Sequence, residues 1–238
     1  MFFNFLSHFK DILLDFVAPN YCEVCKSYIG TELTRIKYLC NKCYDAFPIA
    51  DRTEIITNKM IVNFDVDELA ITNLFSLIRV KENLDYMNLI YSLKYNGIKN
   101  IGIEFGKELA KIVMKESKTQ YDCIVPVPIH RAKLLERGYN QSLFIAKGLS
   151  EKMNIPVNDK LIKRKKYTVT QTQLNKEQRK TNIMNAISEY KPNLKIDGKR
   201  ILLCDDVFTT GSTTNVCANK LLEMGAKQVD VATIVIAS

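Results

Sequence analysis

The sequence has no long apolar run, few histidines and neither of two common nucleotide-binding signatures. No stretch of about 18 apolar residues occurs, so no transmembrane helix is expected. The two histidines, His8 and His130, have no cysteine or serine placed to act with them, so no hydrolytic triad can be assembled. Neither G-x-x-x-x-G-K-[ST] nor G-x-G-x-x-G is present, which argues against P-loop and dinucleotide-binding folds.

The N-terminal segment also lacks the features of a secretion signal. Residues 1–20 have no positively charged start, and Lys10, Asp11 and Asp15 interrupt the apolar residues at intervals that suit one face of a helix. We expect this helix to pack on the body of the protein; contact with a membrane surface is the alternative. The simplest location for the chain is the cytoplasm.

Acidic residues are fewer than basic residues, and most of the excess positive charge lies in one segment. The formal net charge is +8, and between Lys160 and Lys180 there are eight basic residues and one acidic residue. Such clustered basicity favours an anionic partner, phosphate or nucleic acid, whereas a solvated charged loop is the alternative. We expect a basic hood at about 160–185, and its candidate contacts with single-stranded DNA are Lys163, Arg164, Lys165, Lys166 and Arg179.

Four of the seven cysteines form the pattern C-x2-C-x14-C-x2-C, at Cys22, Cys25, Cys40 and Cys43. Two such pairs supply four thiolates that can close a tetrahedron around Zn²⁺, and four protein ligands leave no open catalytic position. A structural zinc site is therefore predicted, in preference to two disulfides or a redox C-x-x-C pair. The remaining cysteines lie in apolar contexts and are expected to be buried: Cys123, Cys204 and Cys217.

Strand-like and helix-like segments alternate along most of the chain. Helices are predicted at 83–95, 103–116, 139–154 and 213–224, and strands at 68–78, 121–129, 155–164, 199–206 and 228–237. Residues 165–185 read as a long loop with a short helix at 175–184. This order indicates an α/β domain, residues 51–238, with a mainly parallel sheet covered by helices on both faces. A zinc-ribbon-like module and the N-terminal helix occupy residues 1–50.

The stretch "ILLCDDVFTTGST" joins a strand to a helix through polar and small residues. In open α/β sheets ligands bind at the carboxyl ends of strands, and a helix N-terminus favours anions. The backbone and hydroxyls of Thr209, Thr210, Gly211, Ser212 and Thr213 therefore predict a phosphate monoester site. Asp205 and Asp206 suit ribose hydroxyls and Mg²⁺ instead. Simple helix capping, the alternative, accounts for Ser212 or Thr213 alone.

The same stretch is similar to the phosphoribosyl pyrophosphate (PRPP) binding motif of type I phosphoribosyltransferases. Further motifs occur in the order found in the ComF family and cover nearly all of the chain: "CEVC…CNKC", "LKYNG", "PVPIHRAKLLERGYNQS" and "LIKRKKYTVTQTQLNKEQRKTNIMNAI". The chain thus resembles this family. The resemblance implies a type I phosphoribosyltransferase-like fold with the four-cysteine module in front of it.

The resemblance also implies roles for individual residues. Asp205 and Asp206, the catalytic candidates, hold the ribose hydroxyls with Mg²⁺ nearby, and Thr209 to Thr213 hold the 5′-phosphate. Candidates for pyrophosphate are Arg131, Arg137 and Lys94, with Arg164 a further one. Small departures are Tyr139 in place of the usual Phe and Cys204 in place of Val. The pyrophosphate loop lacks the glycine-rich form of many active enzymes, and no residue stands out as a general base.

Two functions from different classes follow. The first is a PRPP-binding protein of DNA uptake and natural transformation that binds single-stranded DNA and other DNA-uptake proteins. Tyr139 and Tyr167 are then the nearest aromatic rings for stacking on bases, with packing as the alternative use. The second is an active phosphoribosyltransferase of nucleotide metabolism or salvage with an unknown acceptor. A purely regulatory nucleotide ligand is a third possibility.

Overall fold

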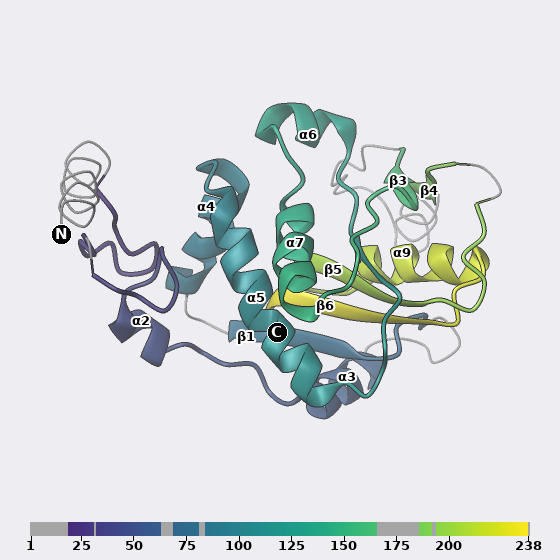
Figure 1. The fold of residues 1–238 in the computed structure, drawn as a ribbon, viewed down its shortest axis with the longest axis horizontal. Coiled ribbons are helices and arrows are strands. Elements are labelled where there is room, and N and C mark those ends of the chain that lie inside the picture. The colour runs from purple at the N-terminus through teal and green to yellow at the C-terminus, as the bar shows by residue number, and fades with distance from the viewer. Residues whose placement is uncertain are drawn as a thin grey trace, which may run out of the picture.

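A four-stranded parallel sheet forms the centre of the protein (Figure 1). The computed structural model describes residues 19–30, 32–62, 69–80, 84–165, 186–191 and 194–237. The strand order is β1-β6-β5-β2, with bounds β1 Leu74–Val80, β2 Cys123–Pro126, β5 Arg200–Phe208 and β6 Gln228–Ala237. The mainly parallel sheet predicted from the sequence is confirmed.

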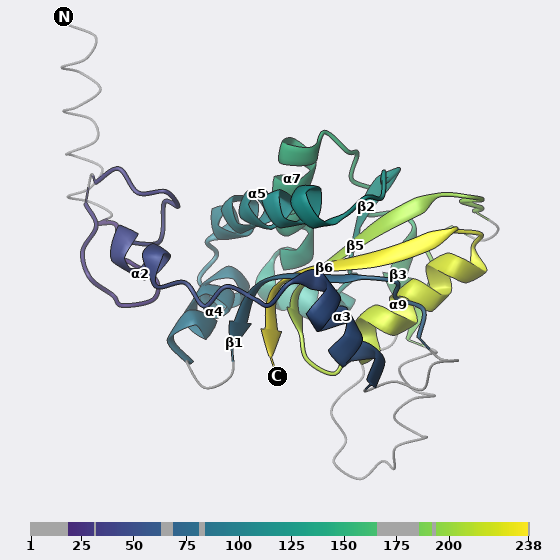
Figure 2. The same cartoon turned by 90° about the horizontal axis from the view of Figure 1, so that it is seen from below.

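Helices cover both faces of this sheet, as predicted (Figure 2). One face carries α5 (Lys99–Glu116) and α7 (Gln141–Met153); the other carries α3 (Thr53–Val62) and α9 (Ser212–Glu223). Along β5, Leu202 packs in the cluster formed with α5 and α7, whereas Ile201 and Leu203 pack in the cluster formed with α3 and α9. Both faces are therefore apolar, and the strand reads as a continuous hydrophobic run.

The helices α5 and α7 cross at two glycines. A Cβ atom added to Gly106 would lie 2.3 Å from the carbonyl oxygen of Ile145, and one added to Gly148 would lie 2.1 Å from that of Ile103. Only glycine permits this approach of two backbones. The crossing fixes the N-terminus of α7 near the end of β5, where Ser142 of α7 contacts Asp205.

Several boundaries differ from the sequence-based ones. The helix expected from Ile103 begins at Lys99, and the strand expected at 155–164 is only β3, Ile162–Arg164, paired antiparallel with β4, Ile187–Glu189. The strand expected to end at 206 runs on to Phe208. The helix α4 (Met87–Tyr95) follows a 3₁₀ turn at Leu84–Tyr86 and ends at Asn96-Gly97, as predicted. The predicted N-terminal helix and most of the 165–185 loop lie outside the described residues.

The four-cysteine segment packs against the start of the α/β domain. It contains one short helix, α2 (Asn41–Asp45), and lies beside α4 (Figure 1). The Tyr86 hydroxyl lies 3.0 Å from the carbonyl oxygens of both Cys43 and Ala46, and the Ser92 hydroxyl donates to Glu23 over 2.6 Å. Among the described residues, no helix is long and apolar enough to span a membrane.

Candidate functional site

The two aspartates lie near the end of β5, where the parallel strands lead into loops and helices. The Ser142 hydroxyl, in the first turn of α7, donates to Asp205 over 2.8 Å. Asn140 caps this helix: its side chain accepts from the Ser142 N–H and donates to the Val127 carbonyl after β2. One side chain thus ties the β2 loop to α7, and α7 in turn holds Asp205.

Asp206 faces a different partner. Its Oδ2 lies 2.8 Å from the ammonium of Lys94, which comes from α4, and only 4% of Asp206 is exposed. A buried carboxylate needs such a partner because an unpaired charge is costly in the protein interior. The structure therefore brings together three residues singled out in the sequence: Asp205, Asp206 and Lys94.

Asp205 has an unusual protonation equilibrium. Burial and the charge of Asp206 raise the pKa of the Asp205 carboxyl to about 7, although the Ser142 hydroxyl, the Asp206 N–H and Lys94 all lower it. A raised carboxyl pKa means that the site favours a bound proton. Separately from this pKa, carboxylate oxygens are ligands that Mg²⁺ accepts, so the donor set suits this ion.

Residues 209–213, for which the sequence predicts a phosphate site, directly follow β5 and are called the phosphate-site loop. Thr209 and Thr210 are exposed, and Gly211 has a φ of 73°, the left-handed conformation that favours glycine. Gly211 is the N-cap of α9, so Ser212 and Thr213 form its first turn. The Thr210 and Ser212 hydroxyls are 2.9 Å apart. Since the first N–H groups of a helix have no helical acceptor, this turn offers backbone donors to an anion.

The two candidate arginines, Arg131 and Arg137, lie at opposite ends of α6 (Arg131–Arg137). Arg131 is exposed and, within the described residues, forms no ion pair. The Arg137 guanidinium lies 5.1 Å from the centroid of the Tyr95 ring and donates to the Tyr95 hydroxyl over 3.3 Å. Arg137 is therefore held against α4, the helix that also provides Lys94.

Part of the basic segment borders the site. Arg164, at the end of β3, forms a parallel bridge with His130, which caps α6. Lys163 donates to the Tyr190 carbonyl over 3.0 Å, and Lys165 is exposed. Lys166 and Arg179, like Tyr167, lie outside the described residues.

Tyr139 is not available for stacking. It is 7% exposed, its hydroxyl donates to the Leu93 carbonyl, and the Lys99 ammonium lies 5.0 Å from its ring centroid. The suggestion that it stacks on bases is wrong, and its alternative use in packing is correct. Exposed tyrosines near the site are found on α4 instead, where the sequence showed only a helical apolar pattern.

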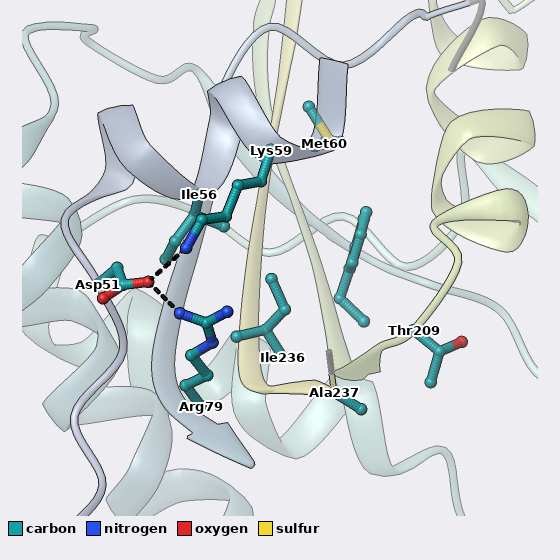
Figure 3. Close-up of a pocket in the computed structure, with 9 residues that line it drawn as sticks. Asp51, Ile56, Lys59, Met60, Arg79, Thr209, Ile236 and Ala237 are labelled. Carbon is teal, nitrogen blue, oxygen red and sulfur yellow. Dashed lines mark hydrogen bonds and ion pairs between the residues drawn. The ribbon is translucent and has the colours of Figure 1, made fainter. Parts of the chain in front are cut away.

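A small cavity of about 150 Å³ adjoins the phosphate-site loop at Thr209 (Figure 3). The ammonium of Lys59 lies 3.0 Å from Asp51, and Arg79 pairs with the same carboxylate. Ile236 and Ala237 of β6 contribute apolar atoms. Because its two cations already face a carboxylate, the turn at 209–213 offers the better anion site.

The four cysteines of the N-terminal segment form one cluster. Their Sγ atoms all lie within 4.8 Å of one another, and those of Cys25 and Cys40 are 3.8 Å apart. Zinc–sulfur bonds of about 2.3 Å in a tetrahedron give sulfur–sulfur edges of about 3.8 Å, so the donor set fits a metal ion such as zinc. The Ser27 hydroxyl and N–H lower the pKa of the Cys25 thiol to about 6, whereas burial raises the pKa of the Cys22 and Cys43 thiols. The other three cysteines, Cys123, Cys204 and Cys217, are buried, as predicted, and lie outside this cluster.

Comparison with known proteins agrees with the resemblance found in the sequence. Residues 140–237 match the phosphoribosyl transferase domain. Over 212 residues the chain is 27% identical to Competence protein F of Haemophilus influenzae, covering 89% of this chain and 82% of that protein. The chain is similar to ComF-family proteins. It is also 32% identical over 147 residues to DNA utilization protein YhgH of Escherichia coli, covering 60% of this chain and 63% of that protein.

A solved structure similar to this chain is glutamine phosphoribosylpyrophosphate amidotransferase from B. subtilis. The two share 22% identity over 60% of this chain and 30% of the amidotransferase, with a TM-score of 0.41. A purine phosphoribosyltransferase from Pyrococcus horikoshii shares 20% identity over 57% of this chain and 73% of that enzyme, with a TM-score of 0.35.

The sequence located the acidic pair and the turn beside it but did not identify Ser142, the partner of Asp205. The available signal was its position in "YNQS", where Asn140 and Ser142 have the residue types that start a helix. Ser142 and Asp205 are 63 positions apart in the sequence, so their contact depends on the fold and cannot be predicted from local pattern.

Proposed function

We propose that this protein binds PRPP, or a related ribose 5-phosphate, at the end of β5, and that it acts in DNA uptake during natural transformation. The observation that carries the proposal is the acidic pair Asp205–Asp206, supported by Ser142 and Lys94 directly before an anion-binding helix N-terminus. A sugar phosphate carries both kinds of group that this arrangement suits: hydroxyls for the carboxylates and a phosphate for the turn at 209–213.

In this proposal each part of the site meets one part of the ligand. The backbone and hydroxyls of Thr209, Thr210, Gly211, Ser212 and Thr213 hold the 5′-phosphate. Asp205 and Asp206 accept hydrogen bonds from the ribose hydroxyls, and Mg²⁺ neutralises their charge together with that of the pyrophosphate. Lys94, Arg131 and Arg137 face the pyrophosphate, with Arg164 beside them. Zn²⁺ held by the four cysteines has a structural role.

Two observations support single-stranded DNA as a partner: the positive charge of the basic segment and the similarity to named relatives. The formal net charge is +8, and the described part of the basic segment, Lys163 to Lys165, lies beside the connection that leads to α6. Lys166 and Arg179 continue this segment in the sequence. One relative is named DNA utilization protein YhgH, and another is named Competence protein F. We therefore infer that phosphates of single-stranded DNA contact these cations.

A second candidate is catalytic phosphoribosyl transfer. An acceptor amine or base would attack C1 of the ribose while the bond from C1 to the pyrophosphate oxygen breaks, and pyrophosphate leaves. The observation that favours it is the fixed position of Asp205, which the Ser142 hydroxyl holds over 2.8 Å beside Asp206, where the proposal places the ribose. Pyrophosphate release from PRPP across a panel of amines and nucleobases distinguishes catalysis from binding alone.

The binding proposal is tested by thermal unfolding with a panel of ligands. PRPP and ribose 5-phosphate, each with Mg²⁺, are expected to raise the unfolding midpoint, whereas ribose and inorganic phosphate alone are expected to raise it much less. Replacing Gly211 by Ala puts a side chain at a φ of 73° and should remove the effect. Equal stabilisation by inorganic phosphate and ribose 5-phosphate would contradict a sugar phosphate site.

A further inference from the structure

Two exposed tyrosines occupy the outer face of α4. Tyr91 and Tyr95 are 56% and 52% exposed, and their ring centroids are 4.9 Å apart with a tilt of 42°. A spacing of four residues places both on one side of a helix. The opposite side of the same helix buries Leu89, Ile90 and Leu93 in the core. Burial in the core therefore does not account for these two rings.

This aromatic face adjoins the site at the end of β5. Lys94, next to Tyr95 in the sequence, reaches inward to Asp206. On the outside, the Arg137 guanidinium from α6 lies over the Tyr95 ring and donates to its hydroxyl. The cation is thereby held beside the rings, with a planar group that itself stacks on aromatic systems. The result is a surface of two exposed rings and one half-buried guanidinium, formed by α4 and α6.

We propose that Tyr91 and Tyr95 form a stacking platform for the bases of single-stranded nucleic acid. This inference rests on the proposed function, since it identifies where a bound strand would place its bases. Proteins that bind single strands without sequence preference combine cations for the phosphates with aromatic rings for the bases. The strand's phosphates meet the cations of α6 and β3, and one or two of its bases lie on the tyrosine rings. Tyr139 is buried and does not serve this purpose.

The test measures the affinity of the full chain for two fluorescent oligonucleotides of equal length. One is a normal single strand and the other has abasic positions, so the two differ in bases while their phosphate charge is the same. Replacing both tyrosines, Tyr91→Ala with Tyr95→Ala, should weaken binding of the normal strand by about ten-fold or more, as expected for lost base stacking. The variant should no longer distinguish the abasic strand. Its dependence on salt should stay as in the wild type, because no phosphate contact is lost.

Two control variants test whether the loss of affinity is specific to the aromatic rings of α4. Tyr91→Phe with Tyr95→Phe keeps the rings and should bind like the wild type. Tyr21→Ala with Tyr28→Ala removes another exposed tyrosine pair, 48% and 58% exposed, from the four-cysteine segment, and should also leave the affinity unchanged. If the α4 double variant is unstable, Tyr91→Ala alone keeps the contact of Tyr95 with Arg137 and should still reduce discrimination against the abasic strand.

Each outcome separates this inference from the proposed function. Wild-type protein that binds the normal strand no better than the abasic one overturns the platform and leaves DNA binding intact. Unchanged affinity of the double variant Tyr91→Ala/Tyr95→Ala for the normal strand also overturns the platform and leaves DNA binding intact. Wild-type protein that binds neither strand at low salt overturns both the platform and the DNA part of the proposed function. Ribose 5-phosphate binding by the variants, measured separately, reports on the β5 site alone.

Discussion

At the scale of single residues, the main question is why two adjacent carboxylates are stable beside a turn proposed to bind an anion. Each has its own partner: the Ser142 hydroxyl for Asp205 and the Lys94 ammonium for Asp206. The sequence predicted the acidic pair and singled out Lys94 as a pyrophosphate ligand. It did not predict the ion pair of Lys94 with Asp206, because pairing across 112 positions depends on how α4 packs. In free protein, Lys94 therefore stabilises the acidic pair.

The raised pKa of Asp205 leads to a prediction about stability and pH. An unfolded aspartate has a pKa of about 3.9, so a folded pKa of about 7 means that folding favours the protonated carboxyl. The stability that this carboxyl provides is complete below pH 4 and is lost as the pH rises to about 7. Asp205→Asn, which cannot ionise, should therefore unfold at a higher temperature than the wild type at pH 8, with a much smaller difference at pH 5.

Thermal unfolding of both proteins in the absence of ligand, at pH 5, 6, 7 and 8, measures this effect. Ser142→Ala serves as a control, because it removes the hydroxyl that lowers the pKa of Asp205 and should destabilise the protein most at high pH. A difference between Asp205→Asn and wild type that does not vary with pH would show that the carboxyl has an ordinary pKa.

At the scale of elements, the helix α3 shows where the sequence pattern was insufficient. The stretch "TEIITNKMIV" buries Thr53, Ile56, Thr57 and Met60, so two of its four core-facing positions are threonines. Its apolar residues alone therefore gave no clear helical period. Moreover, its first N–H group is capped from another element: the Thr53 N–H donates to Glu116 at the end of α5 over 2.8 Å. Because Glu116 is 63 positions away from Thr53, this cap cannot be predicted from the local sequence.

The helices α5 and α7 were both predicted, but their crossing was not. The crossing depends on Gly106 and Gly148, and it holds the N-terminus of α7, with Ser142, against Asp205. Helix content is a local property, whereas the contact between two helix backbones is visible only once they are packed.

Gly148→Ala should destabilise the protein strongly, because the new Cβ would lie 2.1 Å from the Ile103 carbonyl. We expect a loss on the order of 2–4 kcal/mol in the free energy of unfolding, as for severe overpacking. The control is Gly102→Ala in α5, where the Cβ would lie 3.0 Å from the Phe144 side chain. There a gain in helix propensity of about 1 kcal/mol offsets part of the strain. Urea denaturation of both variants measures the difference, and equal stabilities would contradict the close crossing.

At the scale of the whole molecule, the four-cysteine segment and the β5 site are linked through α4. The buried residues Cys22, Ile36 and Leu39 belong to the same core as Leu89 and Leu93 of α4. The cysteine pattern alone predicted the cluster because C-x-x-C spacing is a local signal. Its packing on the helix that carries Lys94, Tyr91 and Tyr95 required the structure.

Removal of the metal should therefore affect the distant site. With zinc bound to the four cysteines, treatment with a chelator is expected to reduce the amide hydrogen-exchange protection of α4. Because Lys94 and Asp206 then lose their fixed geometry, affinity for ribose 5-phosphate should fall several-fold as well. Added Zn²⁺ should restore both, and the exchange of α9 serves as an internal reference. Unchanged protection of α4 after complete metal loss would show that the two parts are independent.

The central claim is that the acidic pair and the turn at 209–213 form one site for a ribose 5-phosphate. Calorimetric titration of PRPP with Mg²⁺ into the wild type and into the double variant Asp205→Asn/Asp206→Asn tests it most directly. The account predicts binding by the wild type that weakens without Mg²⁺, and a loss of at least about 100-fold in the double variant, the effect of about 2.7 kcal/mol. Wild-type protein that binds no PRPP, or a double variant that binds it with unchanged affinity, would contradict the account.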